Sequence, residues 1–371
     1  MKLGQALSVF EAALPEDIAA PYREALVKLQ EEAPPMPVST VYRVLDEQFG
    51  TRWRERFKHF DEHPAAAASI GQVHRGTWHD GRDVAVKVQY PGAGPALIAD
   101  LNQLSRLARL YGMVTPGLDM KPLIAEIRAR VTDELDYRLE ATTQRAFATA
   151  FADDPDFLVP TVVASAPYVV ISEWIEGTPL RKIITEGSQS ERNRAGELLG
   201  TLTFAGPARA GYLHADPHPG NYRLMSDGRL GVLDFGAVKA FPDGLPDFIG
   251  HIIRLVLDGD SDAALQGLRD NDFLRGEIEV DTWELTEYIG SVLDPIKSDG
   301  FKFTRQWLQG EAARLTNPKG PAMKFGRQLN LPSEYVMIHR VLLGSIGILC
   351  QLGAEADYRG IVTEWLPGFA D

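Results

Sequence analysis

Residues 214–221 are HADPHPGN, and a little further along the chain residues 234–236 are DFG. The first stretch places His214, Asp216 and Asn221 around two prolines, and the second adds Asp234. Metal sites, hydrolases and phosphoryl-transfer centres all use side chains of these types. The prolines fix φ and stiffen the turn that presents Asp216 and Asn221. The rest of the sequence must distinguish the three kinds of site.

The composition indicates a globular protein with two lobes or domains. The chain has 371 residues, of which 44% are hydrophobic and 24% are charged, enough for each lobe to have its own core. The formal net charge is −13, and an acidic chain lacks the clustered basic surface that nucleic-acid binding requires. It also gives no general attraction to anionic membranes. We therefore expect no nucleic-acid partner.

The single cysteine and the apolar stretches indicate the compartment. Cys350 stands alone, which excludes an internal disulfide and a cysteine-rich zinc site and favours a reducing compartment. The N-terminal MKLGQALSVF lacks the apolar core and cleavage site of a signal peptide. The apolar stretch at 335–350 is interrupted by His339 and Arg340, and the run after Arg340 is too short to span a bilayer. We expect this stretch to be a core helix of a cytoplasmic protein.

The hydrophobic pattern predicts helices, then a small group of strands, then mostly helices. Residues before 50 favour helices, and further helices are predicted at 96–111 and 121–151. Between 69 and 90, SIGQVHRGTW and DVAVKVQY flank an Asp-Gly turn, which predicts a β-hairpin. A second hairpin with an Asp-Gly turn is predicted at 221–236. This order of elements predicts an α+β fold with a helical extension, a small mixed lobe and a larger helical lobe.

Lys87 lies in VAVK, on a predicted strand whose alternate side chains are apolar. A lysine at this position points either into a cleft or into solvent. If VAVK is considered without the other motifs, a solvent-exposed lysine is the simpler interpretation. The alternative is the strand lysine that holds nucleotide phosphates.

Asp216, Asn221 and Asp234 match the pattern of a phosphoryl-transfer centre. In the kinase catalytic loop an Asp orients the nucleophile, and an Asn five residues later holds a metal ion, which is the spacing of Asp216 and Asn221. Asp234 follows the strand-like RLGVL, and its carboxylate suits Mg²⁺. A transition-metal site built from His214, His218 and Asp234 is the competing interpretation, but no H-x-x-x-H or CxxC pair supplies firm ligands for it.

An ordered series of motifs runs along nearly the whole chain. The motifs are KLGQ at 2–5, AAAASIGQVH at 65–74, VAVKVQYPG at 84–92, ELDYRLEA at 134–141, HADPHPGN at 214–221 and DFG at 234–236. Together they resemble the UbiB (AarF-type) family of atypical kinases, which is named for its link to coenzyme Q biosynthesis.

This resemblance implies a bilobal protein-kinase-like α+β fold with a small β-containing N-lobe, a larger helical C-lobe and extra N-terminal helices. The implied domains are a helical extension with the K-x-G-Q motif at 1–63, an N-lobe at 64–172 with inserted helices at about 93–120, and a C-lobe at 173–371.

In this resemblance the alanines at 65–68 stand where protein kinases have a glycine-rich loop. Writing the kinase pattern G-x-G-x-x-G-x-V so that it ends at Val73 puts Ala66 and Ala68 at the first two glycines, while Gly71 keeps the third. Their Cβ atoms restrict positive φ and fill space where backbone amides would approach phosphates, which implies altered nucleotide preference and poor protein kinase activity. The alternative is a helix start, which the IGQV that follows disfavours. The implied nucleotide-binding residues of the N-lobe are Ala66, Ala67, Ala68, Ser69, Gly71, Val73 and Lys87.

Glu140 is the expected carboxylate partner of Lys87, because the family's corresponding glutamate lies on the helix predicted at 121–151. The implied catalytic residues are Asp216, Lys87 and Glu140, and the implied ligands of Mg²⁺ or Mn²⁺ are Asn221 and Asp234.

The segment ISEWIEG at 171–177 resembles the hinge between the lobes of a kinase. Glu173, Trp174 and Ile175 would present backbone groups to adenine there.

The regulatory residues that the resemblance implies are Lys2, Gln5, Glu134 and Asp136. Lys2 and Gln5 belong to a segment that in the family lies over the site where a protein substrate would dock. Lys2 would pair with Glu134 or Asp136 and close the cleft, whereas a solvated acidic helix face is the alternative for the two carboxylates. KLGQ begins directly after Met1, while relatives carry residues before it, so a longer natural chain with a membrane anchor is an open expectation.

The residues and the resemblance together predict an enzyme that binds ATP or ADP with Mg²⁺ between two lobes. It would be an ATPase or a kinase of a small-molecule or lipid-like substrate in quinone or other lipid metabolism, with peripheral membrane association left open. The segment after DFG contains no A-P-E and no Ser/Thr/Tyr-rich activation loop, which weighs against a conventional protein kinase. Two alternatives stay open: a non-catalytic, nucleotide-gated scaffold for partner enzymes, and a small-molecule phosphotransferase of the aminoglycoside type.

Overall fold

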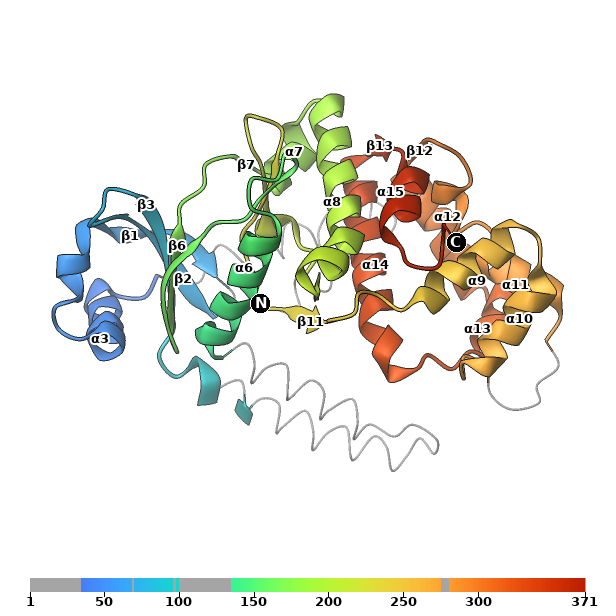
Figure 1. The fold of residues 1–371 in the computed structure, drawn as a ribbon, viewed down its shortest axis with the longest axis horizontal. Helices are drawn as coiled ribbons and strands as arrows, with labels where there is room; N and C mark the ends of the chain where they lie inside the picture. Colours follow the sequence, from blue (N-terminus) through green and yellow to red (C-terminus); the bar gives the residue numbers. More distant parts are fainter. Residues whose placement is uncertain (1–34, 69, 96–97, 100–134, 275–279, 371) are drawn as a thin grey trace.

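The computed structural model describes residues 35–68, 70–95, 98–99, 135–274 and 280–370. Figure 1 shows a small lobe with a sheet at one end and a larger, mostly helical lobe at the other. The helix α6 (Tyr137–Ala150) packs against the sheet of the small lobe and against the long helix α8 (Gln189–Ala210) of the large lobe. The predicted two-lobed α+β fold is confirmed.

The small lobe is built on one antiparallel sheet with the strand order β1-β2-β3-β6-β5. The predicted hairpin is β2 and β3, and its turn contains Gly81, whose φ of 101° favours glycine. Val84, Val86 and Val88 alternate along β3 and are buried against α3. The elements are α3 (Val38–Phe49), a 3₁₀ helix (Trp53–Arg56), β1 (Phe57–Ala68), β2 (Gly71–Trp78), β3 (Asp83–Gln89), β5 (Val162–Ala166) and β6 (Val169–Glu173).

The first strand starts before the expected beginning of the N-lobe at residue 64. Residues up to 63 were expected to belong to the helical extension, whereas β1 begins at Phe57. A cluster of aromatic rings explains this start: the ring of Phe57 lies edge-on to Trp78 of β2 and to Trp53, with centroids 4.8 and 5.8 Å apart. The Phe57–Trp78 pair joins two different strands, so the local hydrophobic periodicity did not predict it.

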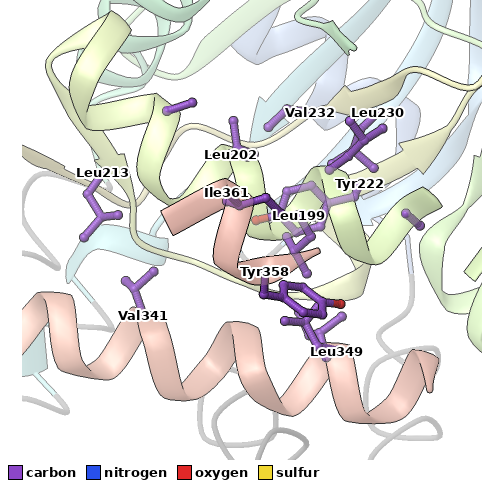
Figure 2. Packing of buried hydrophobic residues seen from close by; sticks show 14 of the residues in the cluster. Leu199, Leu202, Leu213, Tyr222, Leu230, Val232, Val341, Leu349, Tyr358 and Ile361 are labelled. Atoms are coloured by element: carbon purple, nitrogen blue, oxygen red, sulfur yellow. The ribbon is translucent and has the colours of Figure 1, made fainter. Parts of the chain in front are cut away.

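The large lobe is organised around α8. This helix starts at a capping box made by Ser188 and Glu191 and ends at Gly211, whose φ is 71°. Figure 2 shows apolar side chains of α8, α14 (Ser333–Leu352) and α15 (Tyr358–Trp365) meeting in its core. The other helices are α7 (Leu180–Glu186), α9 (Asp247–Leu257), α10 (Ser261–Asp270), α11 (Thr282–Ile289), α12 (Arg305–Thr316) and α13 (Pro321–Gly326), with 3₁₀ turns at Pro219–Asn221 and Asp294–Ile296.

Short strands of the large lobe carry the two polar motifs. HADPHPGN connects β8 to β9, and DFG connects β10 to β11. The strand β10 pairs with β9 in a sheet of order β4-β10-β9-β7, and β11 pairs with β8. Both motifs therefore lie at the same ends of these paired strands. The strands are β4 (Phe157–Leu158), β7 (Thr178–Pro179), β8 (Tyr212–His214), β9 (Tyr222–Leu224), β10 (Leu230–Val232), β11 (Val238–Ala240), β12 (Phe301–Lys302) and β13 (Glu355–Ala356).

Among the described residues, α14 is the one helix long and apolar enough to cross a membrane by length and composition. Its segment Glu334–Leu352 has a mean hydropathy of 1.5, but 61% of that segment is buried inside the fold. The helix packs against α8, while His339 and Arg340 are exposed. The expectation of a core helix is confirmed.

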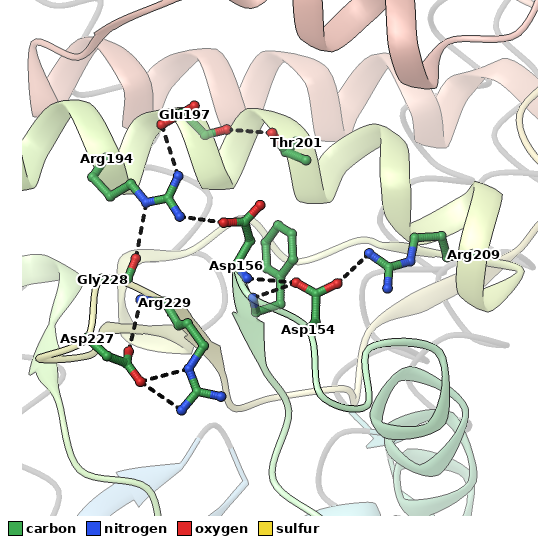
Figure 3. A network of polar contacts seen from close by, with 10 residues as sticks. Asp154, Asp156, Arg194, Glu197, Thr201, Arg209, Asp227, Gly228 and Arg229 are labelled. Atoms are coloured by element: carbon green, nitrogen blue, oxygen red, sulfur yellow. Dashed lines mark hydrogen bonds and ion pairs between the residues drawn. The ribbon is translucent and has the colours of Figure 1, made fainter.

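A polar network ties the end of α6 to α8 (Figure 3). Asp154 follows α6, accepts hydrogen bonds from the backbone amides of Asp156 and Phe157 at 2.8 and 3.0 Å, and pairs with Arg209 of α8 at 2.7 Å. Asp156 pairs with Arg194 of the same helix. These contacts anchor α6 to the large lobe, and α6 in turn presents side chains to the small lobe.

Candidate active site

Lys87 and Glu140 form an ion pair between the small-lobe sheet and α6. Lys87 lies on β3, and its ammonium Nζ donates to both carboxylate oxygens of Glu140 on α6, at 2.7 and 2.9 Å. Their side chains are 14% and 5% exposed, so Lys87 is not a solvated strand lysine. The N-lobe strand and the α6 helix are therefore joined at the pair that the sequence analysis expected.

Asp234 of DFG is the second carboxylate at Lys87. Its Oδ2 lies 3.2 Å from the lysine Nζ, and its Oδ1 accepts the backbone amide of Gly236 at 2.9 Å. The next residue, Phe235, is 1% exposed, and its ring centroid lies 5.0 Å from that of Phe147 on α6. The DFG turn is thus held against the same helix that supplies Glu140.

The pKa values of these three groups reflect burial opposed by their mutual charges. Burial acts to lower the pKa of Lys87, but the carboxylates of Asp234 and Glu140 outweigh it and raise that pKa. Burial raises the pKa of Glu140, against the effect of the nearby Lys87. Burial also acts to raise the pKa of Asp234, but Lys87 and the Gly236 amide lower it to about 2. Asp234 consequently stays ionised at neutral pH.

Asp216 and Asn221 face each other across the HADPHPGN turn. The side-chain amide of Asn221 donates to the carboxylate Oδ2 and to the backbone carbonyl of Asp216, both at 3.0 Å. The backbone amide of His218 also donates to the Asp216 carbonyl at 2.8 Å. The turn is therefore closed on itself, and the Asp216 carboxylate has a fixed orientation.

The His214 ring links the two motifs through its two nitrogens. Its Nε2 lies 2.6 Å from the backbone carbonyl of Asp234, and its Nδ1 lies 3.3 Å from the hydroxyl of Tyr222. A neutral ring that donates from Nε2 and accepts at Nδ1 satisfies both contacts, and burial lowers the pKa of His214, which favours that neutral form. Because both ring nitrogens are engaged, the competing transition-metal site would need His214 to give up one of these bonds.

The donor set in this site fits a hard cation. Asp234 offers a carboxylate, and the amide nitrogen of Asn221 is committed to Asp216, which leaves its oxygen as the acceptor. Carboxylate and amide oxygens are ligands that Mg²⁺ accepts. Asn221 and Asp234 would therefore be the residues that hold such an ion.

The turn between β1 and β2 lies beside the strand that carries Lys87. Ala66, Ala67 and Ala68 are paired in β1 with Val73, Gln72 and Gly71 of β2, so the alternative of a helix start for the alanines is wrong. Gly71 is required here, because an added Cβ would lie 2.3 Å from the carbonyl oxygen of Val88. Val73 pairs directly with Lys87. Ser69 lies outside the described residues.

The hinge segment follows β6. Glu173 ends that strand and its carboxylate pairs with Arg82 at 3.0 Å, while the backbone amide of Trp174 donates to the Asp83 carbonyl at 2.8 Å. The pairing of β3 with β6 therefore already uses the Trp174 amide. The backbone amide of Glu173 likewise donates to the Thr161 carbonyl at 2.9 Å. The carbonyl of Glu173 and the backbone groups of Ile175 stay as the candidates for adenine recognition.

Of the four expected regulatory residues, the structure describes Asp136. Its side chain accepts the amide of Arg138 and caps the N-terminus of α6, and it also pairs with the Arg138 guanidinium at 2.6 Å. Lys2, Gln5 and Glu134 lie outside the described residues, as does most of the helix predicted at 96–111. The helix predicted at 121–151 is described from residue 135 onward, and there the helix begins at Tyr137, after its N-cap Asp136, because the Asp136 side chain accepts a hydrogen bond from the Arg138 amide.

The sequence patterns did not indicate the support that α14 gives to the HADPHPGN turn. Arg340 donates to the backbone carbonyl of Ala215 at 3.1 Å, and Gly344 lies so close to Pro217 that an added Cβ would be 2.5 Å from the proline Cγ. These residues lie far from the turn in sequence and belong to an apolar helix, so no motif marked them.

Comparisons with known proteins identify the family of the chain. The family described as "ABC1 atypical kinase-like domain" matches residues 28–267. The rat protein "Atypical kinase COQ8B, mitochondrial" is 30% identical over 366 residues, which cover 97% of this chain and 68% of that protein. The Arabidopsis thaliana "Protein ACTIVITY OF BC1 COMPLEX KINASE 3, chloroplastic" is 32% identical over 379 residues, which cover 100% of this chain and 51% of that protein.

A solved structure is also similar along the whole chain. It is the complex of Rv3197 with erythromycin from Mycobacterium tuberculosis, which is 46% identical, has a TM-score of 0.83, and is matched over 100% of this chain and 93% of that one. The chain spans about half the length of several curated relatives, among them the Caenorhabditis elegans atypical kinase coq-8, of which it covers 48%. By its motifs, its two-lobed fold and these matches, the chain belongs to the ABC1 family of atypical kinase-like proteins, also called the UbiB family.

Proposed function

We propose that this protein binds a magnesium–adenine nucleotide between its lobes and acts as an ATPase or as a kinase of a small molecule. One observation carries this proposal: Lys87 from the small lobe contacts Glu140 at 2.7 Å and Asp234 at 3.2 Å, and the Asp216–Asn221 turn is attached to the Asp234 segment through His214. A buried lysine between two carboxylates, next to a second carboxylate–amide pair, is the arrangement that phosphoryl transfer uses to hold phosphates, metal and nucleophile.

Each side chain has a distinct role in this proposal. Lys87, held by Glu140, would contact the phosphates, while Asn221 and Asp234 would hold Mg²⁺, which neutralises phosphate charge when it is bound. The Asp216 carboxylate, fixed by the Asn221 amide, would orient a water or a substrate hydroxyl. Glu173 and Ile175 would present backbone groups to adenine. The catalytic contribution would come from positioning and charge neutralisation, without a covalent enzyme intermediate.

The proposed substrate class and pathway rest on similarity to the family and not on the geometry of the site. A small-molecule or lipid-like acceptor in quinone or other lipid metabolism fits the resemblance to coenzyme Q-linked kinases, and we propose a cytoplasmic protein with peripheral membrane contact. The proposed nucleotide is ATP or ADP, and Mn²⁺ could replace Mg²⁺.

The test is Mg²⁺-dependent phosphate release from ATP by the wild type and by Asp216→Asn, with and without a phenolic lipid mimic in vesicles. We expect the substitution to lower turnover by about a hundredfold or more, because it removes the group that orients the nucleophile. Asp262→Asn, a change at an exposed position of α10, is the matched control. Equal rates for the wild type and Asp216→Asn would refute the role of Asp216, and nucleotide binding without turnover in every condition would favour the nucleotide-gated scaffold.

The Mycobacterium tuberculosis relative supports a second candidate function. Its structure was solved as a complex with erythromycin, and it is 46% identical to this chain, so we also propose macrolide binding, in line with the antibiotic phosphotransferase alternative. The measurement is titration calorimetry with erythromycin, followed by mass spectrometry of the macrolide after incubation with Mg²⁺ and ATP. A mass increase of one phosphate would identify a phosphotransferase, and no heat of binding would eliminate this candidate.

A further inference from the structure

Tyr137 is a buried phenol at the centre of the site to which no role has been given. It is the first residue of α6, one turn before Glu140, and it is 1% exposed. Its backbone amide is satisfied by the carbonyl of Pro167 at 3.0 Å. Its hydroxyl, in contrast, is buried and has no hydrogen-bond partner in the described part of the chain. A buried hydroxyl without a partner is costly, so this one requires an explanation.

The phenol extends from the lysine to the base of the β1–β2 turn. The Lys87 ammonium lies 5.1 Å from the centroid of the Tyr137 ring, which is within the range of a cation–π contact. The hydroxyl oxygen lies 3.0 Å from the position of a Cβ added to Gly71, and Ile70 packs against the same cluster of side chains. Tyr137 therefore contacts both parts of the small lobe that are proposed to surround the phosphates.

We propose that the Tyr137 hydroxyl donates a hydrogen bond to a phosphate oxygen of the bound nucleotide. This inference rests on the proposed function, because it needs a nucleotide whose phosphates lie between Lys87 and the β1–β2 turn. A phosphate oxygen there is a charged acceptor, and a neutral phenol next to an ammonium is a donor suited to it. Burial raises the pKa of Tyr137, so the hydroxyl keeps its proton at neutral pH.

The chain offers a matched control for this phenol. Tyr358 on α15 is also buried and also has, among the described residues, a hydroxyl without a partner, but it lies in the large-lobe core against Gly196 and Gly200 of α8. Tyr137→Phe and Tyr358→Phe thus remove the same atom from similar surroundings. Both should leave the melting temperature of the nucleotide-free protein unchanged or slightly raised, because each removes a buried polar atom that makes no bond.

The experiment measures dissociation constants of adenosine, ADP and ATP, with Mg²⁺, for the wild type and the two variants. We expect Tyr137→Phe to weaken ADP and ATP by about tenfold to a hundredfold, the usual effect of losing a hydrogen bond to a charged group. We expect adenosine to bind all three proteins equally, and Tyr358→Phe to bind every ligand like the wild type.

The outcomes separate this inference from the proposed function. If the wild type binds neither ADP nor ATP, the proposed function fails. If the wild type binds them and Tyr137→Phe binds them equally well, the function stands and the phosphate contact is refuted. If Tyr137→Phe weakens adenosine as much as ATP, the hydroxyl acts on the fold of the site and not on a phosphate, which also overturns the inference.

Discussion

Gly344 of α14 gives a sharp test of how the HADPHPGN turn is held. In Gly344→Ala the new Cβ would lie 2.5 Å from the Cγ of Pro217. Carbon atoms in contact are separated by about 3.5–4.0 Å, so helix and turn must separate by about 1 Å or more. The proline ring cannot rotate away, and Asp216 is the residue next to it. The substitution therefore moves the carboxylate proposed to orient the nucleophile, although it adds a single methyl group to another helix.

The expected effects differ between turnover and binding. A displacement of about 1 Å in a catalytic group costs about a hundredfold in rate, so we expect Mg²⁺-dependent phosphate release to fall by about that factor. Nucleotide affinity should change by less than about threefold, because Lys87 and Glu140 lie on β3 and α6 and keep their contact. The free energy of unfolding should fall by about 1–3 kcal/mol, the usual cost of overpacking.

Two further variants make the assay decisive. Gly310→Ala is the control, because Gly310 of α12 has nothing within 4 Å of an added Cβ and should keep wild-type turnover with a stability gain of up to about 1 kcal/mol. In Gly344→Ala combined with Pro217→Ala the clashing ring is gone, so turnover should equal that of Pro217→Ala alone, which reports any effect of losing the proline. Wild-type turnover in Gly344→Ala, or a further large loss on adding Gly344→Ala to Pro217→Ala, would refute the view that α14 positions Asp216 through Pro217.

Three other predictions concern stability. Gly71→Ala would place a Cβ 2.3 Å from the Val88 carbonyl oxygen, so we expect a loss of about 1–3 kcal/mol in urea unfolding, and unchanged stability would contradict the close approach of β2 and β3. Burial lowers the pKa of His74 in the folded protein, so below about pH 6.5 the unfolded chain binds more protons than the folded protein does. The free energy of unfolding should therefore be highest above that pH and decrease below it. In unfolding curves from about pH 5 to 8, His74→Gln should reduce this dependence, and an unchanged dependence would contradict the role of His74. Asp154→Ala leaves two backbone amides and a guanidinium without their acceptor, so the free energy of unfolding should fall by about 1–3 kcal/mol. Glu197→Ala, which removes an exposed ion pair, should lower it by less than about 0.5 kcal/mol. Similar losses for both variants would show that the network of Figure 3 does not anchor α6.

The β2–β3 hairpin of the small lobe and several candidate site residues were predictable, because they depend on residues that are neighbours in sequence. The Asp-Gly turn between β2 and β3 favours one backbone geometry whatever surrounds it, and Gly81 adopts it. The alternating valines around Lys87 predicted which face of β3 is buried. The pairing of Lys87 with Glu140 came from a family resemblance and not from spacing, since the two residues lie in different elements.

Contacts between distant segments were not predictable in this way. The start of β1 depends on the contact of Phe57 with Trp78 of the neighbouring strand β2. The Trp174 amide is occupied because β6 stays paired with β3 up to Asp83. Tyr137 lies in a motif that the sequence analysis quoted, yet its unpartnered hydroxyl becomes visible only when Gly71 and Lys87 are placed around it.

Local sequence patterns were enough to propose Lys87, Asp216, Asn221 and Asp234 as chemical groups, because turns, strands and short motifs depend on neighbouring residues. How these groups are oriented and supported follows from the three-dimensional fold. It placed Glu140 at 2.7 Å from Lys87, engaged both nitrogens of His214, and set Gly344 against Pro217. The physical reason is that the burial, the packing and the electrostatic surroundings of a group depend on many segments that are distant in sequence. The fold alone brings those segments together.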